Sequence, residues 1–152
     1  PPPHQALLLV DLAPPNFHSG ESAEKERNWR RHLFGFDLRT ARVFEDESGK
    51  SGTNPEELIA AAHASCFTMQ LSHFLAEAGH PAARLTTDAE VTIGPVPSGG
   101  QEISKSALTL RGKVPGMSEA QFVELANKAK AGCPVSKALG AIEITLDAKL
   151  EA

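Results

Sequence analysis

The clearest pattern of apolar and polar positions predicts a long helix that begins at Pro55. Asn54 is a favourable N-cap, Pro55 suits the first helical position, and Glu57 stands where a capping box needs an acid. The segment that follows is almost free of charged residues, and Gly79 is a typical stop signal. Because a helix that is apolar on most sides is buried, we expect residues 55–78 to form a central, covered helix.

Alternating apolar and polar residues predict strands before and after this helix. We interpret residues 36–45, 84–93, 103–114 and 141–150 as strands, and the last of these alternates most cleanly. Clean alternation indicates a strand with one covered face, which is typical of antiparallel sheets. Since strands and helices do not alternate strictly along the chain, we expect an α+β fold with helices packed on a mostly antiparallel sheet.

A second amphipathic helix is expected between the last two strands. Ser118 is its predicted N-cap, Gln121 completes a weaker capping box, and Gly132 ends it. Its inward stripe consists of Phe122, Leu125, Ala126 and Ala129. Cys133 should therefore lie just past the helix, beside Pro134, where the helical hydrogen-bond ladder cannot continue.

Composition narrows the class of protein. A chain of 152 residues with 41% hydrophobic residues fits one domain with a real core. The net charge of −4 and the lack of a basic cluster argue against nucleic acid and anionic membrane partners. The apolar run 6–10 is too short to span a bilayer and has no basic segment before it, so we expect a cytoplasmic protein.

The amino-terminal part differs from the rest of the chain. Residues 1–20 contain five prolines and no usable periodicity, and a densely charged stretch follows over residues 21–32. We therefore expect an amino-terminal arm with a charged segment over residues 1–35, and a folded domain over residues 36–152.

The most informative chemical feature is a pair of cysteines 67 residues apart, Cys66 and Cys133. A pair placed this way can react with an oxidant and then with each other, so redox chemistry is the leading interpretation. The alternative is that Cys66 is only a small apolar residue of the core, which is the usual role of a buried cysteine. Cys66 lies too far along its helix for the macrodipole to act, so a reactive thiolate needs a cation with it. Arg39 and Arg42, on the preceding strand, are the candidates, although both also fit a solvated strand face.

Glu56 and His63 have simpler interpretations beside possible roles at Cys66. Glu56 precedes Cys66 by ten residues, about 15 Å along an ideal helix axis, so any joint role needs a bridging arginine, a helix break or a second subunit. His63, Cys66 and His73 lie on one helix and do not converge on one tetrahedral ion. We therefore expect a satisfied core or interface histidine at position 63, with no metal and no bound cofactor.

Three segments carry a family resemblance. GTNPEELIAAAHASCF at 52–67, AKAGCPVS at 129–136 and AIEITLDAKL at 141–150 closely resemble the osmotically inducible protein C (OsmC) family, sister of the organic hydroperoxide resistance proteins. The similarity spans about two thirds of the chain, residues 52–151. The sister group typically has a Gly-Tyr pair where this chain has Ala-His at 62–63, so the sequence resembles the OsmC branch proper.

The resemblance implies a Cys-dependent peroxidase that reduces organic hydroperoxides in stress defence and is recycled by an external dithiol reductant. It implies an intertwined homodimer with its active sites at the subunit interface. By position, Cys66 matches the peroxidatic cysteine, Cys133 the resolving cysteine, and Glu56 the acid that holds the catalytic arginine. One inserted residue leaves both Arg39 and Arg42 as matches to that arginine.

Two further expectations concern the substrate cleft. Apolar side chains near Cys66, namely Phe67, Met69 and Phe74, would favour alkyl peroxides over hydrogen peroxide. The rival to an enzyme is a non-catalytic stress protein that binds a small apolar ligand at the dimer interface, which would keep the fold without needing the thiols.

Overall fold

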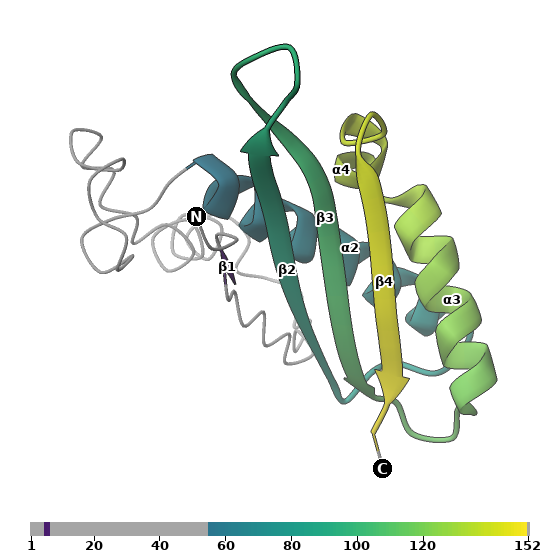
Figure 1. Ribbon diagram of the computed structural model, residues 1–152. Helices are drawn as coiled ribbons and strands as arrows, with labels where there is room; N and C mark the ends of the chain where they lie inside the picture. Colours follow the sequence, from purple (N-terminus) through teal and green to yellow (C-terminus); the bar gives the residue numbers. More distant parts are fainter. Residues whose placement is uncertain (1–4, 7–54, 152) are drawn as a thin grey trace, which may run out of the picture. The chain divides into compact units, whose positions relative to one another are not determined.

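The computed structural model describes residues 5–6 and 55–151 (Figure 1). Its elements are β1 (Gln5–Ala6), α2 (Pro55–Glu77), β2 (Arg84–Pro95), β3 (Gln101–Lys113), α3 (Glu119–Gly132), α4 (Pro134–Ala138) and β4 (Glu143–Leu150). Helices and strands are both present, which confirms the α+β class. The expected strand 36–45, which carries Arg39 and Arg42, and almost all of the segment 1–35 lie outside the described residues.

The described strands form one sheet in the order β1-β2-β3-β4. β2 pairs antiparallel with both β1 and β3, whereas β4 runs parallel to β3. The expectation of an antiparallel partner for the last strand was therefore wrong. The chain leaves β3, crosses through α3 and α4, and returns in the same direction, as a parallel pair requires. Clean alternation showed correctly that β4 is half-covered, but it carries no information about strand direction.

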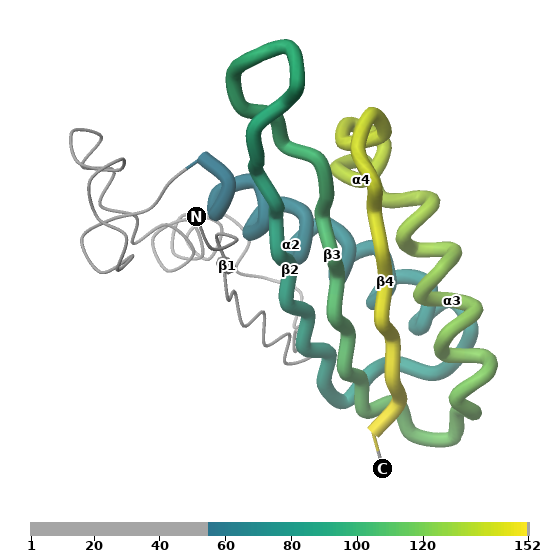
Figure 2. The backbone as a smooth tube through the Cα atoms, in the orientation of Figure 1, coloured from purple at the N-terminus to yellow at the C-terminus, as the bar shows by residue number. Residues whose placement is uncertain are grey.

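Helices α2 and α3 lie on one face of this sheet, as the tube in Figure 2 makes clear. The core between them is mostly apolar and shielded from solvent, with Phe67, Leu71, Leu108, Leu110 and Phe122 among its largest members. One contact is unusually close. A Cβ atom on Gly112 would lie 2.4 Å from Cζ of Phe122, so only glycine lets α3 approach β3 at this point.

Helix α2 has the predicted bounds almost to the residue, and Gly79 follows it with a φ of +80°. Its burial differs from the prediction, because within the described part only one side is covered. Ala60, Ala64, Phe67 and Leu71 are buried, whereas Met69 on the opposite side is 62% exposed. Apolar as it is, α2 does not qualify as a membrane span, and neither does any other helix among the described residues.

Helix α3 forms as its sequence signals predict. Ser118 caps it and exchanges hydrogen bonds with Gln121 in a complete capping box. The helix ends at Gly132, and the backbone N–H of Cys133 donates to the carbonyl of Ala129 at 2.8 Å. Cys133 is at the same time the N-cap residue of α4, whose first residue is Pro134. The second cysteine therefore occupies the junction between two helices.

Candidate active site

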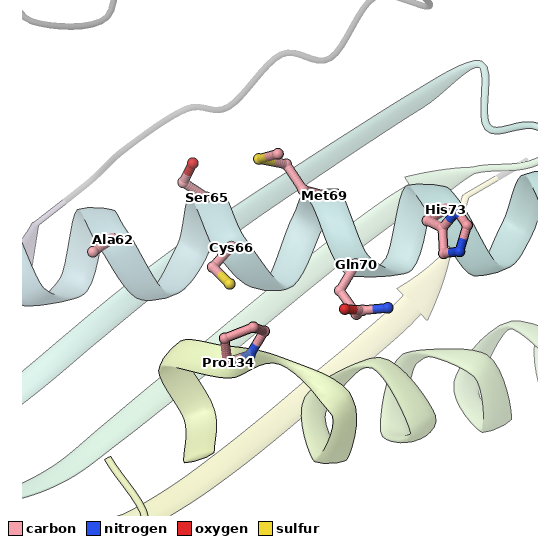
Figure 3. Close-up of a pocket in the computed structure, with 7 residues that line it drawn as sticks. All are labelled: Ala62, Ser65, Cys66, Met69, Gln70, His73 and Pro134. Carbon is pink, nitrogen blue, oxygen red and sulfur yellow. The ribbon is translucent and has the colours of Figure 1, made fainter. Parts of the chain in front are cut away.

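Cys66 lies in the middle of α2, half-buried, at a surface pocket of about 410 Å³ (Figure 3). The sulfur points from α2 toward Pro134, at the beginning of α4. Both helices line the pocket, and most of the lining residues come from α2. The lining residues are Ala62, Ser65, Cys66, Met69, Gln70, His73 and Pro134. A small molecule can therefore reach the first cysteine from solvent.

Cys133 is fully buried beneath this pocket's edge, and the fold brings it to Cys66. The Cys133 thiol lies close enough to Cys66 to raise the pKa of the Cys66 thiol, and the backbone of Val135 acts on the same thiol in the opposite direction. Both cysteines are free thiols in this structure. The thiol pair expected from the sequence is thus assembled from α2 and the α3–α4 junction.

The electrostatics at Cys66 differ from those expected of a reactive thiolate. Partial burial raises the pKa of the Cys66 thiol, the neighbouring Cys133 thiol raises this pKa further, and the hydrogen bond from Val135 only partly opposes them. Within residues 55–151, no cation is among the groups that shift this pKa. The predicted arginine partners, Arg39 and Arg42, both lie outside the described residues.

Glu56 stands in the first turn of α2, half-buried, and does not line the pocket. Because α2 is continuous from Pro55 to Glu77, a helix break cannot bring Glu56 to Cys66. Ten residues of helix separate the two side chains by about 15 Å along the axis. Of the joint roles considered from the sequence, a bridging side chain and a second subunit remain.

His63 is a satisfied core histidine, as expected. It is fully buried, and its Nδ1 and Nε2 atoms each lie 2.8 Å from a serine Oγ, of Ser106 and Ser136 respectively. Burial lowers the pKa of His63, so the ring is neutral, with one nitrogen donating and the other accepting. Among the described residues, no group of acidic, histidine or cysteine side chains is arranged to hold a metal ion.

The three apolar residues expected around Cys66 separate in the structure. Met69 lines the pocket, but Phe67 is fully buried in the core. Phe74 packs instead against α3, with the Lys128 ammonium 4.6 Å from its ring centroid. The prediction of one apolar cleft built from all three residues was therefore wrong. The pocket combines Met69 with polar side chains of the same helix. Ser65 and Gln70 were not singled out from the sequence, and His73 was considered there only as a metal ligand.

Comparison with known proteins gives consistent matches. The family described as OsmC-like protein matches residues 47–147. Peroxiredoxin OsmC of Escherichia coli (strain K12) is 48% identical over 118 residues, which cover 78% of this chain and 76% of the relative. The organic hydroperoxide resistance protein of Xanthomonas axonopodis pv. citri (strain 306) is 37% identical over 101 residues, covering 65% and 68% of the two chains.

Solved structures agree with these sequence matches. An organic hydroperoxide resistance protein from Elizabethkingia anophelis superposes with a TM-score of 0.57 at 30% identity, covering 66% of this chain and 71% of the other. An OsmC-like protein from Mycoplasma pneumoniae has a TM-score of 0.62 at 15% identity, covering 70% and 78%, and supports the fold alone.

The buried state of His63 generates a prediction for stability against pH. The folded-state pKa of His63 lies below its ordinary value of about 6.5, so below that pH the unfolded chain binds more protons than the folded one. The free energy of unfolding should therefore fall as the pH drops below about 6.5, by at most about 1.4 kcal/mol per pH unit for this one group. Urea unfolding between neutral pH and mildly acidic pH measures it.

The slope assigned to His63 is isolated by comparing two variants. His63→Gln cannot take up the proton and should lose this part of the pH dependence, although it will be less stable at neutral pH. Thr68→Val removes a buried, hydrogen-bonded side chain of the same helix that has no titrating group, so it should keep the wild-type slope. A wild-type slope in His63→Gln would show that another group titrates instead.

Proposed function

Because this chain belongs to the OsmC-like protein family, we propose that it is a thiol-dependent peroxidase that reduces organic hydroperoxides to alcohols. The observation that carries this proposal is the thiol pair itself. Cys66 at a surface pocket and Cys133 at a helix junction come from segments 67 residues apart in the chain, yet Cys133 lies close enough to Cys66 to raise the pKa of its thiol. A purely structural cysteine does not require a second thiol beside it.

The burial of the two thiols supports a division of roles. Cys66 is partly exposed and faces the pocket, so a peroxide can reach it and it is the peroxidatic cysteine. Cys133 is fully buried, which shields it from peroxide in bulk solvent and suits a resolving cysteine. This is the assignment that the position of each cysteine in its motif also favours.

The proposed cycle follows ordinary thiol chemistry. The Cys66 thiolate attacks the terminal peroxide oxygen, the O–O bond breaks, and Cys66 becomes a sulfenic acid. The alkoxide that leaves takes up the proton that the thiol had lost and departs as the alcohol. The Cys133 sulfur then attacks the Cys66 sulfur, an S–S bond forms, and the sulfenic oxygen leaves as water. An external dithiol reductant restores both thiols by exchange, and a reducing cytoplasm suits such a cycle.

The first step needs a cation that the described residues do not supply. Burial and Cys133 raise the pKa of Cys66, and a neutral thiol is a poor nucleophile. We infer that Arg39 or Arg42 provides the positive charge. Glu56 is too far along α2 to reach Cys66 itself, but an arginine side chain between them would be oriented by its carboxylate. Glu56 then acts as a positioning residue, from the same subunit or from a partner.

We propose further that the active protein is a homodimer. The pocket side of α2 is uncovered in the described part of one chain, and Met69 there is 62% exposed. Covering this apolar surface with a second copy would bury Met69 and enclose the pocket around Cys66, which excludes water from the thiolate.

Replacing the two cysteines separately tests the enzyme assignment. Cys66→Ser should lose essentially all reduction of cumene hydroperoxide, since a serine hydroxyl is not nucleophilic at neutral pH without a base. With excess peroxide and no reductant, the wild type should end as an intramolecular disulfide and Cys133→Ser as a sulfinic acid, measured by mass spectrometry. A parallel assay with hydrogen peroxide reports substrate preference. Full cellular function in Cys66→Ser would favour the rival, a protein that binds a small apolar ligand.

The two arginines are expected to be unequal. Their odd spacing places them on opposite faces of the predicted strand 36–45, so only one can face Cys66 unless the inserted residue forms a bulge that redirects Arg42. In separate Ala variants, one should lose about two orders of magnitude in peroxide turnover, as loss of a preorganised charge does, while the other stays near wild type. Two fully active variants would contradict an arginine-activated thiolate.

The dimer is tested by mass in solution at micromolar concentration. The wild type should have the mass of a dimer, and Met69→Glu should shift it toward the monomer, because a charge then has to be buried in the interface. Ala120→Glu is a matched control on the exposed first turn of α3, where an acid is favourable. An active monomeric wild type would defeat both the dimer and the enclosed pocket.

A further inference from the structure

The core contains a polar chain of three residues, Ser106–His63–Ser136, that the proposed chemistry does not use. It crosses three elements, because Ser106 lies on β3, His63 on α2 and Ser136 on α4. His63 and Ser106 are fully shielded and Ser136 is 7% exposed, so water does not compete for these bonds. Both hydrogen bonds are short, at 2.8 Å.

Burying such a chain is a cost that an apolar core would avoid. Buried, hydrogen-bonded polar side chains stabilise the folded state little more than apolar side chains of the same shape would at the same positions. What hydrogen bonds add is a preferred geometry. The imidazole ring accepts a hydrogen bond from one serine hydroxyl and donates one to the other, and both bonds require a defined distance and angle. The polar chain is therefore better suited to holding elements in a fixed relation than to increasing stability.

The elements it holds are those that carry the thiols. His63 comes three residues before Cys66 on α2, and Ser136 comes three residues after Cys133 on α4. On a helix, residues three apart lie on neighbouring positions of the same side. The His63–Ser136 bond therefore joins α2 and α4 next to the place where the sulfur of Cys66 points toward Pro134 (Figure 3).

Helix α4 needs such support, because it is only five residues long. A single helical turn has little stability of its own. Its N-cap residue, Cys133, makes no side-chain capping bond, and Pro134 cannot donate a backbone hydrogen bond. The backbone bond from Lys137 to the carbonyl of Cys133 orders the turn itself but does not tie it to α2.

We propose that His63 and Ser136 are positioning residues for the resolving step, holding the Cys133 thiol against Cys66 so that the disulfide closes quickly. The inference rests on the proposed function for its role in the cycle, but the geometry it asserts can be measured separately. A disulfide forms only within narrow limits of distance and dihedral angle, so a loosened α4 would lower the share of productive orientations. Sulfenic acid that waits for Cys133 is exposed to a second peroxide and is lost as sulfinic acid.

The first test uses diamide, an oxidant that takes the electrons and protons of both thiols, becomes a hydrazine, and leaves the disulfide. This reaction needs no peroxidase activity. The equilibrium with dithiothreitol then gives the effective concentration of Cys133 toward Cys66 in the full chain. Ser136→Ala should lower this concentration and the rate of disulfide closure about tenfold, the order of one lost directional hydrogen bond. Ser106→Ala should have a smaller effect, because it leaves the His63–Ser136 bond in place.

Thr68→Val is the matched control. Thr68 is fully buried on the same helix, two residues from Cys66. Its hydroxyl donates to the Ala64 carbonyl and accepts from the Thr87 hydroxyl on β2, both at 2.7 Å, without involving α4. Its replacement should cost stability but leave the effective concentration at the wild-type value. A wild-type value in Ser136→Ala, or an equal loss in Thr68→Val, overturns the proposal, because the polar chain then acts on stability alone.

The second test uses cumene hydroperoxide in excess. Ser136→Ala should still oxidise Cys66 with the first equivalent of peroxide, yet leave a larger share of Cys66 as sulfinic acid by mass spectrometry. An unchanged share overturns the positioning role in the cycle. If peroxide fails to oxidise Cys66 in the wild type, the proposed function is wrong, and the diamide comparison still decides whether Ser136 places Cys133.

Discussion

A buried imidazole sets the strictest requirement in this structure. Once His63 is shielded from water, each ring nitrogen needs a partner, or the fold pays the full desolvation cost of an unsatisfied group. The two partners come from β3 and from α4, elements 43 and 73 residues away along the chain. The sheet, the central helix and the α3–α4 junction must therefore be correctly placed relative to one another before the core is complete. The same placement brings the two thiols together.

The features that the sequence predicted are those with local causes. Pro55 begins α2, Ser118 with Gln121 begins α3, and Gly132 with Pro134 puts Cys133 at a junction, because these signals act within a few residues. Strand direction is different. The alternation of β4 reports one covered face, whereas its parallel pairing with β3 depends on the path through two helices.

The features that the sequence did not predict correctly depend on contacts between residues far apart in the chain. An almost uncharged helix gives no sign of which side is covered, so Phe67 and Met69 were assigned to one cleft although one is core and the other surface. Ser106 and Ser136 carry no local signal of a shared histidine. The family resemblance identified Cys66 and Cys133 through their motifs, but it could not show that burial pushes the pKa of Cys66 upward, since that depends on what surrounds the sulfur.

The contact between Gly112 and Phe122 fixes the tilt of α3, and Cys133, the proposed resolving cysteine, lies at the far end of that helix. Cys133 lies eleven residues beyond Phe122, about 16 Å along the helix axis, so a tilt of about 5° at the pivot would carry it sideways by about 1.5 Å. Disulfide closure is sensitive to displacements of that size. A methyl group at Gly112, a position on β3 rather than beside either thiol, would thus change a redox property as well as the stability.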